Sequence, residues 1–157
     1  MLVVIHSGQT GVERGAHRAA ETVGLGSTGF SPLDERDELG PLPHAIASAL
    51  TPCLERGSRA AVRANLLIAS GLVVVIPNRN TPDAFTAMRS LIGSARAQGV
   101  PYAVVDPTSD FDDVRRFVDG LAATSGTVRL MVTGPRATRW AAGERTAWQV
   151  VAHMAVA

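Results

Sequence analysis

Short apolar runs alternate along this chain with longer segments in which apolar residues recur every three or four positions. Runs of four or five apolar residues are typical of buried strands, and the longer periodic segments are typical of amphipathic helices. The apolar runs predict strands over residues 2–6, 72–76, 101–105 and 128–132, with a further short strand over 28–31. The periodic segments predict helices over residues 12–24, 54–70, 83–97, 111–121 and 144–155.

The regular alternation of strands and helices predicts βαβ units and a mostly parallel sheet flanked by helices. The chain has 157 residues, which is enough for one domain with a substantial core. No internal repeat, linker or low-complexity tract interrupts the pattern. We therefore expect a single α/β domain over residues 1–157.

The turn between the first predicted strand and the first predicted helix carries the clearest chemical signal. Gly8 and Gly11 permit positive φ and let a ligand approach the backbone, while Gln9 and Thr10 add side-chain donors. Unpaired N–H groups and the positive end of the helix dipole attract phosphate at such a place. The same spacing also fits an ordinary turn that binds nothing, so the pattern by itself leaves both interpretations open.

Other turns are expected at the same edge of the sheet, because the carboxyl ends of parallel strands meet there and α/β domains bind ligands beyond that edge. The turns after Ile76 and Val132 should join the first turn in one pocket. The candidate ligand-binding residues are therefore Ser7, Gly8, Gln9, Thr10, Gly11, Asn78, Thr81, Gly134, Pro135 and Arg136.

Residues 7–14, SGQTGVER, resemble the first motif of the molybdenum cofactor carrier family, within the SLOG group of Rossmann-like proteins, which typically reads Ser-Gly-Gly-Gln-Thr-Gly-Val-Asp-Arg. Two more stretches look like later blocks of that family: GFSP at 29–32 with Arg36 and GPLP at 40–43, and Gly134-Pro135-Arg136 with Gly143. The resemblance covers nearly the whole chain. It implies a Rossmann-like, doubly wound sheet and a ligand such as molybdenum cofactor (molybdopterin) or a nucleotide.

The chain also departs from the family pattern. Members usually carry Asn-Val-x-Asp-Ser-Asp where residues 65–70 read NLLIAS, so the asparagine remains but the acidic residues do not. Members usually carry Gly-Gly-Thr where residues 78–83 read NRNTPD, and Arg79 is a candidate replacement for the lost phosphate contacts. Related nucleotide hydrolases carry Pro-Gly-Gly-x-Gly-Thr-x-x-Glu here, and their glutamate has no counterpart in this chain.

Residues 31–43 form a long polar stretch rich in proline and acidic residues. A loop of this length inside a compact domain is usually functional or disordered, and it could also be a solvated excursion. With the family resemblance, we expect this loop to form a rim over the first turn, with Arg36 near the ligand.

All fifteen basic residues are arginine, which excludes a lysine-dependent phosphate loop and lysine Schiff-base chemistry. An anion must therefore be bound by arginine, backbone amides and hydroxyls, and the fork of arginine suits phosphate. Arg136 is the preferred candidate because glycine and proline directly before it restrict its direction. The alternative is a structural salt bridge from Arg136 to Asp106 or Glu144.

The composition narrows the possible partners further. A net charge of +1 argues against general affinity for nucleic acid or acidic membranes, and no run of eighteen apolar residues predicts a membrane span. The single cysteine, Cys53, and the absence of a secretory signal predict a cytoplasmic protein. The four histidines are far apart in sequence, so we expect no metal site.

These features favour a binding protein, a carrier, store or sensor for a small phosphorylated ligand, over an enzyme. The alternative is a hydrolase of nucleotides or sugar phosphates with Glu13 as its acid, although an acidic residue there more often interacts with the helix dipole. A degenerate relative that binds nothing is a third possibility. The resemblance also suggests a homo-oligomer, either a dimer or a tetramer.

Overall fold

The computed structural model describes residues 1–81, 86 and 88–155 and contains a parallel five-stranded sheet at its centre. Neighbouring strands of this sheet all run parallel, in the order β2-β1-β9-β7-β8. The strands are β1 (Leu2–Ile5), β2 (Gly26–Thr28), β7 (Gly71–Val75), β8 (Tyr102–Val105) and β9 (Val128–Thr133). The parallel sheet confirms the α/β fold class that the alternating pattern predicts.

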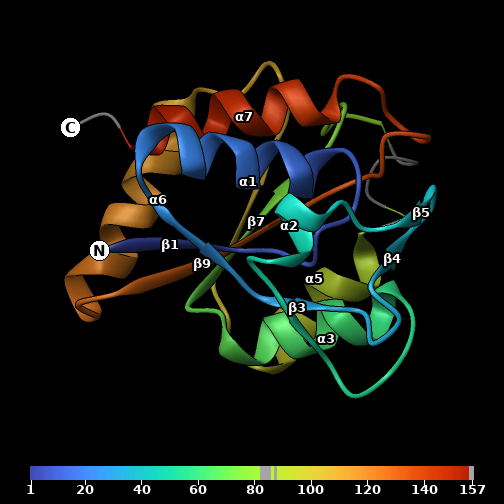
Figure 1. Cartoon of the computed structure of the whole chain (residues 1–157). Coiled ribbons are helices and arrows are strands. Elements are labelled where there is room, and N and C mark those ends of the chain that lie inside the picture. Colours follow the sequence, from blue (N-terminus) through green and yellow to red (C-terminus); the bar gives the residue numbers. More distant parts are fainter. Residues whose placement is uncertain (82–85, 87, 156–157) are drawn as a thin grey trace.

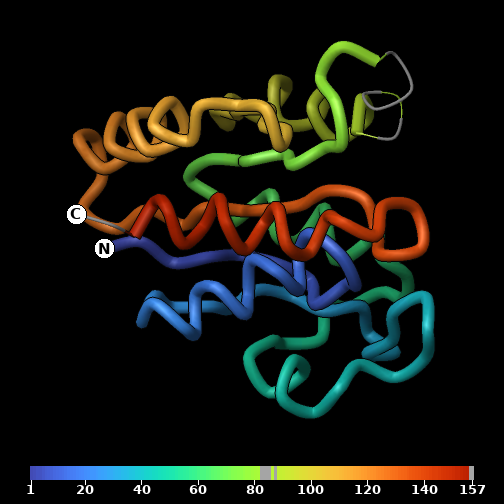
Figure 2. Tube along the Cα trace, turned by 90° about the horizontal axis from the view of Figure 1, so that it is seen from above, coloured from blue at the N-terminus to red at the C-terminus, as the bar shows by residue number. Residues whose placement is uncertain are grey.

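Helices cover both faces of this sheet (Figures 1 and 2). One face packs against α1 (Val12–Val23), α6 (Phe111–Thr124) and α7 (Gly143–Met154), and the other against α3 (Ser58–Ile68) and α5 (Arg89–Ala97). Every residue of β7 is buried, with Val73 in the first of these apolar clusters and Val74 in the second. Successive side chains point to opposite faces, so a strand covered on both faces must be apolar throughout.

The strand order places two distant turns side by side. β9 lies between β1 and β7, with Ile5 opposite Met131, although about 125 residues separate the two strands in sequence. The helices that follow β1 and β9 also pack closely, because α1 has a glycine where it meets α7. A Cβ on Gly15 would lie 2.0 Å from the carbonyl oxygen of Glu144. The turn after β1 therefore adjoins the turn after β9.

Most of the expected elements are confirmed, and two boundaries are corrected. The expected helix over 54–70 begins only at Ser58, since Gly57 before it has a φ of 90°. The expected strand over 28–31 is two strands, β2 in the main sheet and β3 (Phe30–Ser31) outside it. Gly29, with a φ of 140°, separates them. The start of the expected helix over 83–97 lies partly outside the described residues.

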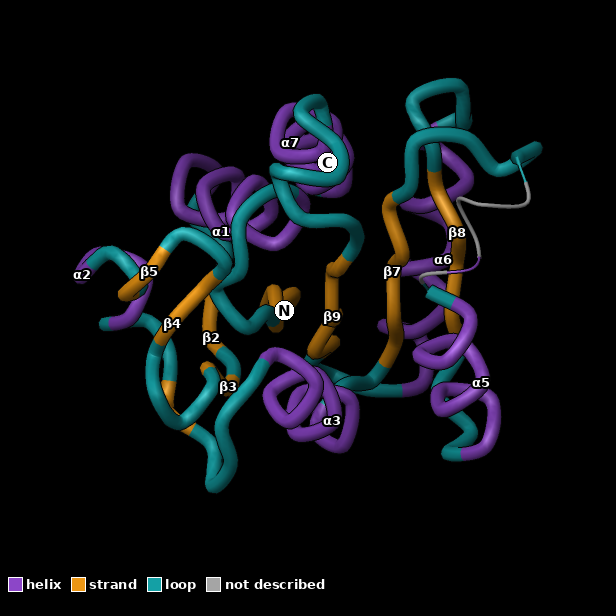
Figure 3. Tube along the Cα trace, turned by 90° about the vertical axis from the view of Figure 1, so that its right-hand side faces the viewer, coloured by secondary structure: helices purple, strands orange, loops and turns teal. Residues whose placement is uncertain are grey.

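The expected loop over 31–43 contains short strands that the sequence pattern does not show. β4 (Arg36–Asp37) pairs antiparallel with β5 (Gly40–Pro41), and after α2 (His44–Ala47) comes β6 (Thr51–Pro52), which pairs with β3. Figure 3 shows β4 and β5 beyond β2, on the opposite side of the molecule from β8. No helix in the described part of the chain is long and apolar enough to cross a membrane.

Candidate functional site

The first turn has the backbone conformation that its glycines predict. Gly8 has a φ of 80° and Gly11 a φ of 82°, in the left-handed region that favours glycine. A Cβ on Gly11 would also lie 2.6 Å from the carbonyl oxygen of Pro135 and 2.8 Å from the amide nitrogen of Ala137. Gly11 is therefore required both for the turn and for its close contact with the segment after β9.

Two buried side chains hold the first part of this turn from inside the molecule. The carboxylate of Glu13 accepts hydrogen bonds from the Ser7 amide at 2.5 Å and the Ser7 hydroxyl at 2.6 Å. Its second oxygen accepts one from the Thr133 hydroxyl at 3.3 Å. Burial raises the pKa of Glu13, while the hydrogen bonds from Ser7 and Thr133 oppose that shift. With 4% of its surface exposed, Glu13 acts as an internal brace of the turn.

His6 is the second internal support. It is fully buried, and its Nδ1 accepts a hydrogen bond from the Gly8 amide at 3.0 Å. A backbone N–H can only donate, so the proton of the neutral ring sits on Nε2, which donates to the Ser27 hydroxyl at 2.9 Å. Burial, followed by the nearby His17 and Arg14, lowers the pKa of His6 to about 3. The sequence leaves open whether His6 ends the strand or reaches the pocket; in the structure it holds Gly8 from below.

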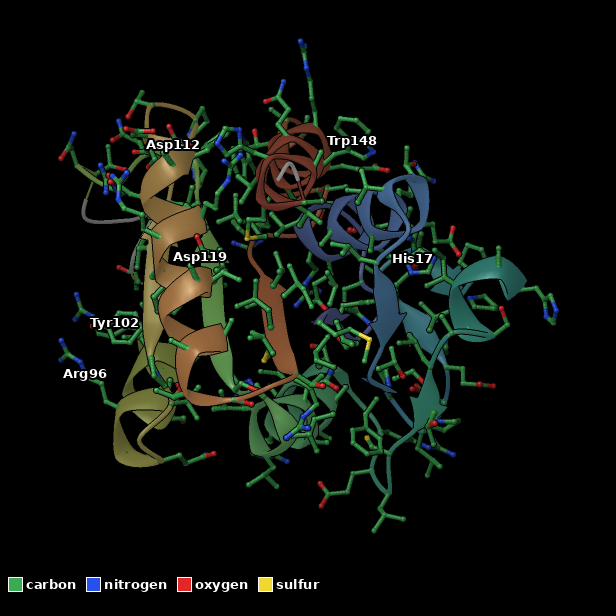
Figure 4. The ribbon with its side chains drawn as sticks, turned by 90° about the vertical axis from the view of Figure 1, so that its left-hand side faces the viewer. His17, Arg96, Tyr102, Asp112, Asp119 and Trp148 are labelled. Carbon is green, nitrogen blue, oxygen red and sulfur yellow. The ribbon has the colours of Figure 1, made fainter. Side chains whose placement is uncertain are left out.

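The hydrogen bonds continue from His6 toward the surface. The Ser27 hydroxyl lies 2.7 Å from Nδ1 of His17, and Nε2 of His17 lies 3.4 Å from the Glu21 carboxylate. Since a carboxylate accepts, His17 carries its proton on Nε2 and accepts from Ser27 on Nδ1. Figure 4 labels His17 on α1, and its side chain lies between that helix and β2. A continuous series of contacts thus runs from the Gly8 amide through His6, Ser27 and His17 to the Glu21 carboxylate, and in each contact the donor is the group nearer to Gly8.

The outer part of the turn has unused donors. The Val12 amide lies 3.4 Å from the carbonyl oxygen of Pro135. The amides of Gln9, Thr10 and Gly11 make no hydrogen bond within the described ranges of the chain. These consecutive N–H groups lie at the positive end of the α1 dipole, where an anion is stabilised.

The loop over 31–43, called the acidic loop from here on, packs against this outer part. The Gln9 side-chain amide donates to the carbonyl oxygen of Arg36 at 3.2 Å. Arg14 pairs with Asp37 at 2.7 Å and also donates to the carbonyl oxygen of Gly8 at 2.9 Å. The side chain of Asp37 is only 3% exposed, so this is a nearly buried ion pair. The acidic loop therefore covers the first turn, as expected for a rim.

Glu38 completes the contact between the acidic loop and the turn. Its carboxylate accepts hydrogen bonds from the hydroxyls of Thr10 and Thr138. Thr10 in turn accepts one from the Ala137 amide at 3.1 Å, which links all three segments. Partial burial acts to raise the pKa of Glu38, but the hydrogen bonds from Thr10 and Thr138 and the charge of Arg136 hold it below its ordinary value. Glu38 is therefore ionised at neutral pH.

A small cavity of about 230 Å³ opens between these segments. Gln9 from the first turn, Arg36 from the acidic loop and Arg136 after β9 all line it. The complete lining is Gln9, Asp34, Arg36, Asp37, Glu38, Gly57, Ser58 and Arg136. Three sequence-predicted residues from distant parts of the chain thus meet at one cavity. Its two guanidinium groups are suited to an anion, and three carboxylates, Asp34, Asp37 and Glu38, line it as well.

The residues before Arg136 shape the turn. A Cβ on Gly134 would lie 2.1 Å from the carbonyl oxygen of Val75, so only glycine fits there. The alternative salt bridges of Arg136 do not form: the partner of Asp106 is Arg79, and the partner of Glu144 is Arg18. Arg136 is exposed and forms no ion pair with any residue that the structure describes.

The loop after β7 does not join this cavity. The carbonyl oxygen of Asn78 accepts hydrogen bonds from the Thr81 amide at 3.4 Å and the Thr81 hydroxyl at 3.1 Å. Asn78 and Thr81 thus contact each other, and neither lines the cavity beside the first turn. Arg79 lies against Asp106, whose carboxylate accepts from the Arg79 amide at 2.9 Å. Burial would raise the pKa of Asp106, but hydrogen bonds from Arg79, Thr108 and Ser109 lower it to about 2.

A second hollow lies between two helices, away from the first turn. This shallower hollow of about 790 Å³ runs between α1 and α7, where the Arg18–Glu144 ion pair lies, and Trp148 flanks it (Figure 4). Its lining contains none of the sequence-predicted site residues, whereas the cavity beside the first turn contains Gln9, Arg36 and Arg136, so the latter remains the candidate site. The described residues contain no group of three or more histidine, cysteine or acidic side chains that could hold a metal ion.

Comparisons with known proteins identify the family of this chain and its fold. A sequence model of the circularly permutated YpsA SLOG family matches residues 4–155. Among solved structures, a protein from Syntrophus aciditrophicus SB named as a proposed molybdenum carrier superposes with a TM-score of 0.78 at 17% sequence identity. The match covers 99% of this chain and 94% of that one, and it shows the same Rossmann-like α/β fold. No curated protein sequence matches.

Proposed function

Because the chain belongs to the circularly permuted YpsA SLOG family, we propose that it binds a small phosphorylated ligand at the first turn, as a carrier, store or sensor. The structural neighbour named as a proposed molybdenum carrier makes molybdenum cofactor one candidate ligand, and a nucleotide is the other. Both present phosphate oxygens, which need hydrogen-bond donors and positive charge.

The observation that carries this proposal is the convergence of donors at the cavity. Gln9, from the turn whose amides at residues 9–11 make no hydrogen bond in the described part of the chain, lines a space together with Arg36 and Arg136. A helix N-terminus contributes only about half a unit of positive charge, which is less than a phosphate carries. In a chain without lysine, arginine must supply the rest, and Arg136 has no other ion-pair partner in the described structure.

The same site offers little for hydrolysis. Glu13 is buried, and both of its oxygens accept hydrogen bonds from Ser7 or Thr133, so it is not directed at a ligand. His6 faces Gly8 and Ser27 rather than the cavity. The alternative, a nucleotide or sugar-phosphate hydrolase, is tested by incubating the protein with nucleoside monophosphates and sugar phosphates and analysing the products. Turnover of any of them would replace binding with catalysis as the function.

Mass spectrometry of the gently purified protein would identify a retained ligand. Binding of that ligand, or of the best binder among the candidates, is then measured by calorimetry for Arg136→Ala. Because a hydrogen bond to a charged group contributes about 1.5–3 kcal/mol, we expect affinity to fall about tenfold or more. The melting temperature without ligand should change little, since Arg136 is exposed and unpaired.

Arg139→Ala is the matched control. Arg139 is an exposed arginine three residues further along the same turn, and it does not line the cavity. Arg139→Ala removes the same charge as Arg136→Ala and should leave the affinity for the ligand nearly unchanged. Equal losses in the two variants would mean that only net charge matters, and an unchanged affinity in Arg136→Ala would remove Arg136 from the proposed site.

We also propose that the protein acts in the cytoplasm, as a homo-oligomer, and without nucleic acid or membrane as a partner. The support for the location and for the absence of nucleic acid and membrane partners is a single buried cysteine without a disulfide and a net charge of +1. The homo-oligomer is what the family resemblance suggests. The partner that we propose is the small phosphorylated ligand of this site.

A further inference from the structure

One carboxylate of the acidic loop faces the first turn instead of solvent. Glu38 accepts hydrogen bonds from the hydroxyls of Thr10 and Thr138, and it lines the cavity together with Arg136. Thr10 belongs to the turn whose free amides mark the positive end of α1. The Glu38 carboxylate thus lies among the donors and the cation that an anionic group of a ligand would use.

The neighbours of Glu38 bind to the turn in the same way, residue by residue. The Arg36 carbonyl accepts from the Gln9 side chain, and Asp37 pairs with Arg14. As a result Gln9 and Thr10 are only 6% and 4% exposed, although they lie at the edge of the sheet where ligands of α/β domains bind. Residues 36–38 therefore close the outer side of the first turn.

The closed cavity is small for the ligands in question. Its volume is about 230 Å³, whereas pockets that hold drug-sized molecules usually measure about 300–1,000 Å³. A nucleotide or a pterin is too large to lie wholly within this space, and its phosphate would meet the Glu38 carboxylate beside Thr10 and Arg136.

We propose that Glu38 is a built-in anion that closes the site, and that the phosphate of the ligand binds by displacing its carboxylate from Thr10 and Thr138. Two anions cannot share these hydroxyls and the charge of Arg136, so binding and release of the loop are one event. The nearly buried Arg14–Asp37 pair stays in place and confines the movement to the residues after Asp37. This inference rests on the proposed function, since it assigns regulation to the same site.

The fastening of the loop can be tested without any ligand, by hydrogen–deuterium exchange of the amides of Glu38, Leu39, Gly40 and Leu42. Glu38→Ala removes both bonds to the hydroxyls, and we expect exchange there to become about tenfold faster. Asp34→Asn is the matched control, because Asp34 lines the same cavity but makes no hydrogen bond to the first turn in the described structure. Equal exchange in Glu38→Ala, Asp34→Asn and the unmodified protein would overturn the proposal.

The displacement is tested by titrating inorganic phosphate into the same proteins and into Glu38→Gln, which keeps the size of the side chain but not its charge. We expect Glu38→Ala and Glu38→Gln to bind phosphate about tenfold more tightly than the unmodified protein, and Asp34→Asn to bind it much as the unmodified protein does. Weaker binding in both Glu38 variants would show that Glu38 supports the ligand, and would overturn the proposal. Tightening by the same factor in Asp34→Asn would also overturn it, because net charge would explain the effect.

The two readouts separate this inference from the proposed function. If Glu38→Ala frees the loop but no variant binds phosphate, the fastening by Glu38 stands and the proposed ligand class is wrong. If the unmodified protein binds phosphate with the loop still protected from exchange, the proposed function stands and the displacement is wrong.

Discussion

Acidification should destabilise this protein through His6, and the structure gives both the sign and the size of the effect. The ring is fully buried and accepts the Gly8 amide on Nδ1, so it cannot take a second proton without losing that bond. Burial, with His17 and Arg14 nearby, lowers the pKa of His6 to about 3, against about 6.5 in an unfolded chain. Below pH 6.5 the unfolded chain therefore binds a proton that the folded protein excludes.

A lowered histidine pKa contributes stability that is fully present above the unfolded value and is lost as the pH falls toward the folded value. Each pH unit within that window corresponds to about 1.4 kcal/mol. Between pH 7 and pH 5, His6 should therefore cost the protein about 2 kcal/mol of unfolding free energy. Glu13 has a raised pKa and acts in the opposite direction, so the wild-type protein alone does not isolate the histidine.

A comparison of the wild type with His6→Asn isolates the contribution of His6 to the pH dependence of stability. The asparagine oxygen can still accept the Gly8 amide, but the side chain does not titrate, while Glu13 and His17 remain in both proteins. Urea unfolding at pH 7 and pH 5 should show the wild type losing about 2 kcal/mol more than the variant. His44→Asn, at an exposed position on α2, is the control and should keep the wild-type pH dependence. The same pH dependence in wild type and His6→Asn would refute the hydrogen-bond assignment, and imidazole ¹⁵N shifts would show the tautomer directly.

Four further outcomes are expected. Gly134→Ala should destabilise the protein by about 1–3 kcal/mol, because its Cβ would lie 2.1 Å from the Val75 carbonyl oxygen, whereas Gly120→Ala, in open space on α6, should be neutral or stabilising by up to about 1 kcal/mol; thermal unfolding checks both. Asn65→Ala should cost about 2 kcal/mol in urea unfolding, since it leaves the half-buried N–H and carbonyl groups of Phe30 without their partner. Light scattering should give a dimer or tetramer, and a mass near 16.4 kDa at micromolar concentration would contradict this. Elemental analysis after chelator washing should find no stoichiometric zinc or iron.

The sequence predicts the sheet and the first turn well because their signals are local. A short, fully apolar run such as 72–76 is typical of a strand that is covered on both faces of the sheet, because both sets of its side chains are then buried. The spacing of Gly8 and Gly11 predicts their positive φ, since few other residues adopt it. Gly57 and Gly29 are also local signals, yet their effect on the neighbouring boundaries depends on contacts that the pattern does not show.

The contacts that close the site could not be predicted in this way. Asn65 accepts from the Phe30 amide at 2.7 Å and donates to its carbonyl oxygen at 3.1 Å, and so replaces a strand pairing across 35 residues of sequence. Thr138 reaches Glu38 across 100 residues. Such bonds join one side chain to one distant group and leave no periodic trace. Asn78 and Thr81 show the converse: they lie after a strand at the expected edge, but a local turn uses their polar groups.

The hydrogen bonds divide the first turn into an inner and an outer half, and this division decides which atoms a ligand can reach. Ser7 and Gly8 donate inward, to Glu13 and His6, which are both buried and supported by further bonds. These donors cannot turn outward without leaving a buried acceptor unpaired, which costs more than an exposed hydrogen bond contributes. The backbone amides of Gln9, Thr10 and Gly11 make no such hydrogen bond in the described part of the chain. In the proposed site, a ligand phosphate would therefore be bound by the outer half together with arginine. Ser7 and Gly8, which also belong to the predicted binding motif, set the shape of the turn.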